Sequence, residues 1–154
     1  MSRVLFVCMG NICRSPTAEA VLRKRVHESG LSRRVEIDSA GLESYHLGDA
    51  PDRRAQSAAR QRGYDLSALR ARRVVREDFA YFDHILAADR SVLNELRRLC
   101  PPEYADRLGL CLDHSRRFKG QDIPDPYYGQ AEGFERVLDM TEDMARGLLE
   151  HFKA

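Results

Sequence analysis

Two side chains near the N-terminus have the types and the spacing for chemistry on a phosphate group. Cys8 and Arg14 are six residues apart in the segment VCMGNICRSPTAEA, which covers 7–20. A cysteine thiolate can attack phosphorus, and the planar guanidinium of an arginine can bind two phosphate oxygens at once. The same spacing occurs again at Cys111 and Arg117, so spacing alone does not identify a phosphate site.

The residues between the cysteine and the arginine distinguish the two segments. The second, LDHSR, has no glycine and carries Asp113, whose charge would repel a bound phosphate. The first, MGNIC, is uncharged, and its Gly10 and Asn11 can adopt left-handed backbone angles that turn successive amides toward an anion. Ser15 and Pro16 then predict a helix start, whose free N–H groups and dipole also favour an anion. Only the first segment therefore predicts an anion-binding loop.

The same surroundings favour the thiolate form of Cys8. Converging amides, the helix N-terminus and Arg14 each stabilise a negative charge on sulfur. Two roles are open to Ser15, which can cap the following helix or donate its hydroxyl hydrogen to the thiolate. The Walker pattern GxxxxGK[ST] does not occur, which argues against a nucleoside triphosphatase. We therefore interpret Cys8 as a nucleophile and Arg14 as the group that binds the phosphate.

Composition argues against several other classes of protein. The formal net charge is +1, which does not indicate binding to nucleic acid or to an acidic membrane. No apolar run is long enough to span a membrane, and the first residues do not resemble a signal peptide. The four cysteines lack the paired spacing of a zinc site, and without an export signal their thiols should stay reduced. We expect a cytoplasmic protein that needs no metal or other cofactor.

Strand and helix patterns alternate along the chain. Strand patterns occur at 3–7, 35–39, 83–88 and 107–112. Helical patterns occur at 15–30, 51–62, 92–99 and 132–152. The segment 72–75 is ambiguous between strand and loop. Such alternation predicts one α/β domain over 1–154, a parallel sheet with helices on both faces, and a ligand site beyond the carboxyl ends of the strands.

Four segments resemble the low-molecular-weight protein tyrosine phosphatases. They are VLFVCMGNICRSPTAEAVLR at 4–23, DSAG at 38–41, EDFAYFDHILAAD at 77–89 and DPYYG at 125–129. The resemblance spans nearly the whole chain, and the two end motifs are specific as a pair. It implies a four-stranded parallel sheet in a flavodoxin-like α/β domain, with Cys8 as the nucleophile.

The resemblance also implies the other site residues. A phenolate departs more easily when it is protonated, so a phosphotyrosine hydrolase needs a general acid, which typically accelerates the reaction about 10²–10⁴-fold. Asp125 matches that acid, between two prolines that stiffen the loop, and Asp113 and Asp122 are its competitors. Around the phosphate and the substrate ring we expect Met9, Gly10, Asn11, Ile12, Cys13, Ser15, Tyr45, Tyr127 and Tyr128.

Two positions leave alternatives open. Cys13 matches a second cysteine of many members, which could form a protective disulfide with Cys8 under peroxide or could be a buried packing thiol. Leu69 stands where some members have a histidine that supports the loop asparagine. Asn11 must then be held by other groups, such as Ser39 or a backbone carbonyl.

Three other activities compete with phosphotyrosine hydrolysis. Protein arginine phosphatases tend to carry threonine at the position of Ile12, so Ile12 and the pair Tyr127 and Tyr128 favour an aryl phosphate. Arsenate reductases coupled to thioredoxin need further cysteines after the third strand, and FDHILAADRSVL at 82–93 has none. A phosphate-binding or flavin-binding module needs neither a thiolate nor a proton donor.

The sequence therefore predicts a metal-independent phosphatase that acts on phosphotyrosine proteins. Its loop should also bind inorganic phosphate and other oxyanions. We expect a monomer, with weak self-association through the tyrosine rim left open.

Overall fold

The computed structural model describes residues 1–127 and 129–154. In this part of the chain four strands form one parallel sheet in the order β2–β1–β3–β4. The strands are β1 (Ser2–Cys8), β2 (Val35–Gly41), β3 (His84–Ala87) and β4 (Leu108–Leu110). The helices are α1 (Arg14–Glu28), α2 (Arg53–Gln61), α3 (Arg76–Tyr81), α4 (Arg90–Leu99) and α5 (Ala131–Lys153), with 3-10 helices η1 (Pro102–Arg107) and η2 (Cys111–His114).

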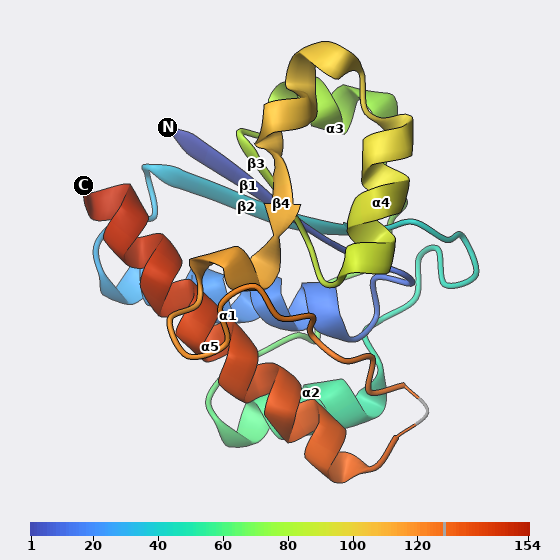
Figure 1. The fold of residues 1–154 in the computed structure, drawn as a ribbon. Helices are drawn as coiled ribbons and strands as arrows, with labels where there is room; N and C mark the ends of the chain where they lie inside the picture. Colours follow the sequence, from blue (N-terminus) through green and yellow to red (C-terminus); the bar gives the residue numbers. More distant parts are fainter. Residues whose placement is uncertain (128) are drawn as a thin grey trace.

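Helices cover both faces of the sheet. α1 and α5 lie on one face, α3 and α4 lie on the other, and α2 packs against α5 (Figure 1). Successive side chains of a strand point to opposite faces, so Val4 and Phe6 of β1 are buried toward α1 and α5. Leu5 and Val7 are buried toward α3 and α4. The α/β fold with a parallel sheet and helices on both faces is confirmed.

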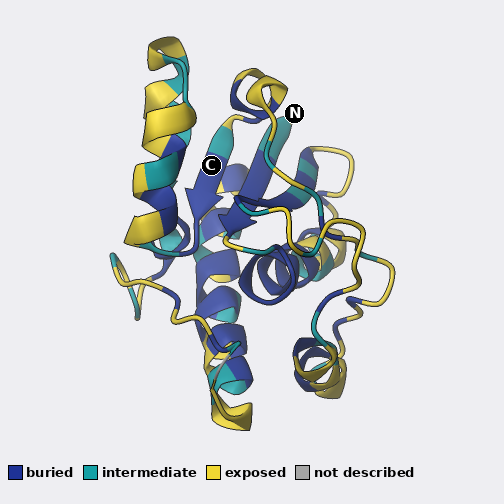
Figure 2. Cartoon of the chain, turned by 90° about the vertical axis from the view of Figure 1, so that its right-hand side faces the viewer, coloured by how far each residue is buried: buried dark blue, intermediate teal, exposed yellow. Residues whose placement is uncertain are grey.

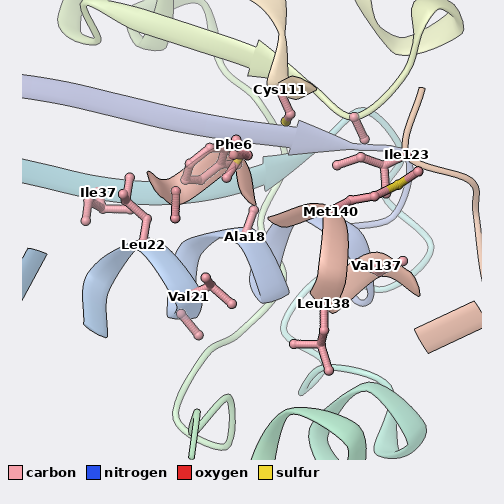
Figure 3. Close-up of a cluster of buried hydrophobic side chains, with 14 of the residues drawn as sticks. Phe6, Ala18, Val21, Leu22, Ile37, Cys111, Ile123, Val137, Leu138 and Met140 are labelled. Carbon is pink, nitrogen blue, oxygen red and sulfur yellow. The ribbon is translucent and has the colours of Figure 1, made fainter. Parts of the chain in front are cut away.

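The packing of α1 fixes the end of the helix that borders the candidate site. Buried residues concentrate in the sheet and in the helix faces that touch it, and exposed residues lie on the outer faces (Figure 2). Val21 and Leu22 of α1 are fully buried in the cluster that contains Phe6 (Figure 3). Burial of one such side chain contributes about 1.5–3 kcal/mol, so tertiary packing holds this helix in place.

The last helix, α5, lies along α1 and supports the chain that leads to Asp125. A methyl group at Gly147 would collide with the backbone carbonyl of His114, so this glycine lets η2 approach α5 closely. No helix of the described residues is both long and apolar enough to cross a membrane. The helix predicted at 132–152 is confirmed, and the side chains that recur along one face of it are all buried: Phe134, Val137, Leu138, Thr141, Ala145, Leu148 and Phe152.

Two predicted boundaries are wrong. The first helix begins at Arg14, with Cys13 at the N-cap position and no side-chain cap, so Ser15 lies inside the first turn and does not cap the helix. The predicted strand at 107–112 contains only the three residues of β4. The chain then turns into η2, because the carboxylate of Asp113 accepts a hydrogen bond from the Leu110 amide at 3.0 Å.

Two features next to the site have only weak local patterns. The ambiguous segment 72–75 is no strand of the sheet, although Arg73 forms a single bridge with Gly41. The short helix α3 follows without having been predicted. Its start is held by Asp78, whose carboxylate accepts a hydrogen bond from the Val75 amide at 2.8 Å.

Candidate active site

The loop after β1 has the shape that a bound anion requires. Cys8 ends the strand and is only 3% exposed, and Asn11 has a left-handed backbone φ of 58°. Gly10 does not adopt the left-handed conformation predicted for it. A Cβ at this position would instead lie 3.1 Å from Cδ2 of His46. Among the described residues, no side chain accepts a hydrogen bond from the amides of 9–14, so these N–H groups are available to an anion.

The end of β2 braces the loop from below. A Cβ on Gly41 would lie 2.9 Å from the Met9 carbonyl oxygen and 3.1 Å from the Asn11 Cβ, so only glycine allows this close approach. The amides of Leu42 and Glu43 both donate to the Met9 carbonyl at 2.9 Å. These contacts explain the position of the DSAG segment beside the cysteine.

A chain of hydrogen bonds under the loop ends at the cysteine sulfur. The backbone N–H of Arg72 donates to Asn11 Oδ1 at 3.0 Å, which turns the amide nitrogen of Asn11 toward two serines. That nitrogen donates to Ser15 Oγ at 2.8 Å and to Ser39 Oγ at 2.9 Å. Ser15 Oγ lies 3.0 Å from the sulfur of Cys8. The Ser15 hydroxyl hydrogen has two possible acceptors, the sulfur at 3.0 Å and the Ala40 carbonyl at 3.5 Å, so it can point at a thiolate of Cys8.

Ser39 continues this chain to a buried charge. Its hydroxyl donates to Oε1 of Glu19 at 2.7 Å, and Glu19 is 3% exposed. Asn11 is thus held by Ser39, the first of the two predicted alternatives, together with Ser15 and the Arg72 amide. Leu69, at the position of the histidine, packs against the core cluster on the α1 side of the sheet.

Arg14 is buried and held by two partners. Its Nη1 donates to Asp89 Oδ2 at 2.7 Å and to the Ile123 carbonyl at 2.8 Å. The other oxygen of Asp89 accepts from the Val92 amide at 2.9 Å and so caps α4. Burial would lower the pKa of Arg14, but the negative charges of Cys8 and Asp89 outweigh it and raise the pKa. The guanidinium therefore stays charged at the edge of the loop.

A cavity of about 350 Å³ opens above the loop. Asp125 lies at its mouth with 47% of its side chain exposed, and Asp125 Oδ2 is 3.8 Å from Arg14 Nη2. Tyr45 is 83% exposed at the rim. The lining residues are Cys8, Met9, Gly10, Ile12, Cys13, Arg14, Glu43, Tyr45, His46, Asp125 and Tyr127.

The structure thus brings most of the predicted residues to one cavity. Asn11 and Ser15 are not among the lining residues but contact the cysteine network beneath the loop. Tyr128 lies outside the described residues. Sequence reasoning missed Glu43 and His46, although they flank Tyr45 and therefore border the same rim.

It also missed Asp89, which orients Arg14. The position of Asp89 offered a signal. It comes two residues after the end of β3, at the edge of the sheet where ligands bind in α/β folds.

The rival acids and the second cysteine segment lie elsewhere. Asp122 pairs with Arg90 at 2.9 Å, and Asp113 accepts from the amide of Leu110. Cys111 is buried, and burial raises the pKa of its thiol. None of these residues borders the cavity. Within 1–127 and 129–154, no group of His, Cys, Asp or Glu side chains could hold a metal ion.

Cys13 lines the same cavity as Cys8, and both are free thiols. Burial raises the pKa of Cys13, and the charges of Asp52 and Cys8 raise it further, so Cys13 stays protonated. A protonated thiol is a poor nucleophile, so Cys13 is not suited to attack phosphorus. The Cys8–Cys13 disulfide stays a prediction. It can be tested by treating the protein with peroxide and analysing it by mass spectrometry under non-reducing conditions.

Known proteins match this chain over nearly its full length. The family model described as low molecular weight phosphotyrosine protein phosphatase matches residues 3–154. A low molecular weight protein-tyrosine-phosphatase of Streptomyces coelicolor is 44% identical over 150 residues, which cover 96% of this chain and 91% of the relative. The crystal structure of a protein tyrosine phosphatase from Entamoeba histolytica, with Hepes in its active site, superposes with a TM-score of 0.94, 41% identity and full coverage of both chains.

A structure with a different named activity is also similar. A Drosophila arginine phosphatase superposes with a TM-score of 0.90 at 33% identity and covers 100% of this chain and 99% of its own. The fold therefore also occurs in a protein described as an arginine phosphatase.

Proposed function

Because this chain belongs to the low molecular weight phosphotyrosine protein phosphatase family and is a phosphatase, we propose that it hydrolyses phosphotyrosine in proteins through a phosphocysteine intermediate. The observation that supports this most is the convergence of three groups on one cavity. The cavity of about 350 Å³ is bordered by Cys8, Arg14 and Asp125, although Cys8 and Asp125 are 117 residues apart in the sequence. We further propose that residues 1–154 act as a single phosphatase domain.

In the first step the thiolate of Cys8 attacks phosphorus, and a P–S bond forms as the P–O bond to tyrosine breaks. The free amides of 9–14 and the guanidinium of Arg14 bind the phosphoryl oxygens, whose charge they stabilise in the transition state. Asp125, protonated at this stage, donates its proton to the departing phenolate oxygen. The phenol of the substrate then leaves neutral.

In the second step Asp125 is a carboxylate and takes a proton from a water molecule. That water attacks phosphorus, the P–S bond breaks, and inorganic phosphate and the thiolate are released. The hydroxyl of Ser15, 3.0 Å from the sulfur, donates a hydrogen bond that stabilises the thiolate as the leaving group. Atoms and protons balance, because Asp125 is again protonated for the next cycle.

The cavity wall favours an aromatic substrate. Met9, Ile12, Tyr45 and Tyr127 give it apolar area on several sides of the cysteine, and an aromatic ring gains stacking or edge contacts from such walls. Ile12 is also the position where the sequence departs from the threonine of arginine phosphatases. We therefore place phosphotyrosine ahead of phosphoarginine, which remains the second candidate because of the Drosophila structure.

The test measures phosphate release from phosphotyrosine, phosphoarginine and phosphoserine peptides in the presence of a metal chelator. Cys8→Ser is the control for contaminating phosphatases. Rapid release from phosphotyrosine that depends on Cys8 is the expected result. Preferential release from phosphoarginine would keep the mechanism and replace the substrate, and absence of release from all three would overturn the proposal.

A further inference from the structure

The loop that carries Asp125 is anchored at its first end by Ile123. This residue is 1% exposed and belongs to the buried cluster that includes Met140 of α5 (Figure 3). Its amide donates to the Ala88 carbonyl at 2.9 Å, and its carbonyl accepts from Arg14 at 2.8 Å. The start of the loop is therefore fixed both to the core and to the arginine of the phosphate loop.

The second end of the loop is anchored by an exposed residue, Arg54, in the first turn of α2. Its Nη2 donates to the Tyr127 carbonyl at 2.8 Å. Its guanidinium also lies over two rings, 5.6 Å from the centroid of Tyr127 and 4.8 Å from that of Phe134. Phe134 is buried near the start of α5, so Arg54 ties the loop to the point where that helix begins.

Asp52 connects Arg54 to the phosphate loop. The Asp52 carboxylate accepts from Arg54 Nε at 3.1 Å and from Nη2 at 2.9 Å, a bidentate pair. The backbone amide of Asp52 donates to the Ile12 carbonyl at 2.8 Å. A continuous path of contacts thus runs from Ile12 through Asp52 and Arg54 to Tyr127.

We infer that Arg54 is a positioning residue that sets the place of Asp125 relative to Cys8, an inference that rests on the proposed role of Asp125 as the general acid. Arg54 does not border the cavity and touches no reacting group. It acts through Tyr127, whose amide donates to Asp125 Oδ1 at 3.0 Å. Asp125 is half exposed, and its ion pair with Arg14 spans 3.8 Å. A shift of Tyr127 therefore moves the carboxylate of Asp125 with it.

A residue that only stabilised the fold would give a different kinetic pattern. Loss of fold stability lowers the amount of active enzyme for every substrate alike. In the first step, which kcat/KM reports, misplacement of the acid slows only the substrates whose leaving group needs a proton, because a good leaving group departs as an anion. The dependence of the rate on the leaving group therefore separates the two roles.

The experiment measures kcat and kcat/KM for a series of aryl phosphates, from nitrophenols to tyrosine-like phenols. The variants are Arg54→Ala, Arg54→Lys, Asp125→Ala and the double variant Arg54→Ala with Asp125→Ala. Arg54→Ala should lower kcat/KM about tenfold for the poorest leaving group and leave that of the best one nearly unchanged. Competitive inhibition by inorganic phosphate should not change, because the phosphate loop keeps its own contacts.

The double variant should show the same leaving-group dependence of kcat/KM as Asp125→Ala alone, because Arg54 affects protonation of the leaving group only through Asp125. Arg54→Lys should restore part of the rate, since lysine keeps the charge near Asp52 but cannot bind Asp52 and Tyr127 with a planar fork. The matched control is Arg53→Ala. Arg53 is the exposed neighbour whose side chain makes no hydrogen bond or ion pair with the described residues, and its loss should leave the whole series unchanged.

Two failures can be told apart. A flat response of Asp125→Ala across the series would overturn the acid assignment in the proposed function. A steep response of Asp125→Ala with a flat response of Arg54→Ala, or with additive losses in the double variant, would overturn the inference about Arg54 alone.

Discussion

The two segments with a cysteine and an arginine six residues apart differ in the negative charge that their surroundings accommodate. At 111–117 this charge belongs to the protein itself. Asp143 of α5 accepts hydrogen bonds from the Ser115 hydroxyl at 2.5 Å and from the amides of Arg116 and Arg117 at 2.9 Å each. At 8–14 no described side chain occupies the amides, and the loop faces a cavity.

The difference shows that a turn with converging amides becomes a binding site only if the fold leaves those amides free. The segment 111–117 lies against α5, where Gly147 allows close approach, so the carboxylate of Asp143 reaches the amides of Arg116 and Arg117. At the first segment, the nearby carboxylate of Asp89 is instead bonded to Arg14 and to α4. The two cysteine side chains also differ in their hydrogen-bond partners. Cys8 lies 3.0 Å from the hydroxyl oxygen of Ser15, which can donate to a thiolate, whereas the Cys111 thiol itself donates to the Leu86 carbonyl at 3.4 Å.

The largest effect expected from this comparison is on turnover. Cys8→Ser should abolish phosphate release, because the serine hydroxyl is not ionised at neutral pH and cannot attack phosphorus at a useful rate. Cys111→Ser is the matched variant in the other segment and should keep the rate per folded molecule, with some loss of thermal stability. Phosphotyrosine peptide assays on both variants check this. Equal loss of activity in the two would remove the functional distinction between the segments.

The second effect concerns two aspartates, Asp125 at the cavity and Asp113 in the segment 111–117. Asp125→Asn should slow hydrolysis of poor leaving groups about 10²-fold, since the amide cannot donate the required proton. Asp113→Asn should leave the rate unchanged, because the Asp113 carboxylate only accepts from the amide of Leu110 beside η2. Steady-state kinetics with an alkyl-substituted phenyl phosphate compares them. A slower Asp113 variant at full folding would contradict the assignment.

The strands and long helices could be predicted from sequence because their apolar residues recur with the right period. α3 could not, since a helix of six residues with Phe79 as its main buried apolar side chain has too few positions to show a period. Of the two roles left open for Ser15, the helix cap is not found, and the contact with the Cys8 sulfur is. The start of α1 is set by burial against the sheet, which a local capping pattern does not report.

Site prediction named Cys8 and Arg14 from their types and surroundings and Asp125 from the family resemblance, and all three border one cavity. It did not reach the residues that act by contact. Asp89 bonds to Arg14 across 75 positions, and Arg54 bonds to Tyr127 across 73. Aspartate and arginine are common on surfaces, so the residue type alone distinguishes neither of them from solvated neighbours. Asp89 could have been found from its place just after β3, whereas no such signal exists for Arg54.

The third effect concerns the carboxylate of Asp143, which should matter for stability and not for catalysis. Burial would raise the pKa of Asp143, but hydrogen bonds from Ser115 and from two amides outweigh it and lower the pKa. A lowered carboxyl pKa stabilises the fold above the ordinary value and loses that contribution as the pH falls through the folded-state pKa. Asp143→Asn should therefore cost about 1.5–3 kcal/mol of unfolding free energy at pH 7.

Urea denaturation of the native protein and Asp143→Asn between pH 7 and pH 3 measures this difference. The difference in unfolding free energy between the two proteins should shrink toward low pH, because the Asp143 carboxyl is then protonated and, like asparagine, uncharged. Activity per folded molecule should stay the same at pH 7. A catalytic defect in the folded variant would mean that segment 111–117 communicates with the cavity, against the comparison.

The smallest effect should come from His114, the histidine of the second segment. Burial lowers its pKa, and His84 and His151, which face it from β3 and α5, lower it further, while the neighbouring Asp113 opposes them. A lowered histidine pKa means that the unfolded chain takes up the proton first as the pH falls below about 6.5. Stability is therefore lost from that pH down to the folded-state pKa. His114→Gln should flatten the pH dependence of the unfolding free energy between pH 7 and pH 5 by at most about 1 kcal/mol.

The cysteine loop carries no histidine, so the leaving-group dependence of phosphate release should be the same in this variant at each pH. If the variant kept the full pH slope, the charge on this cluster would not be coupled to folding, and the second segment would depend on Asp143 alone.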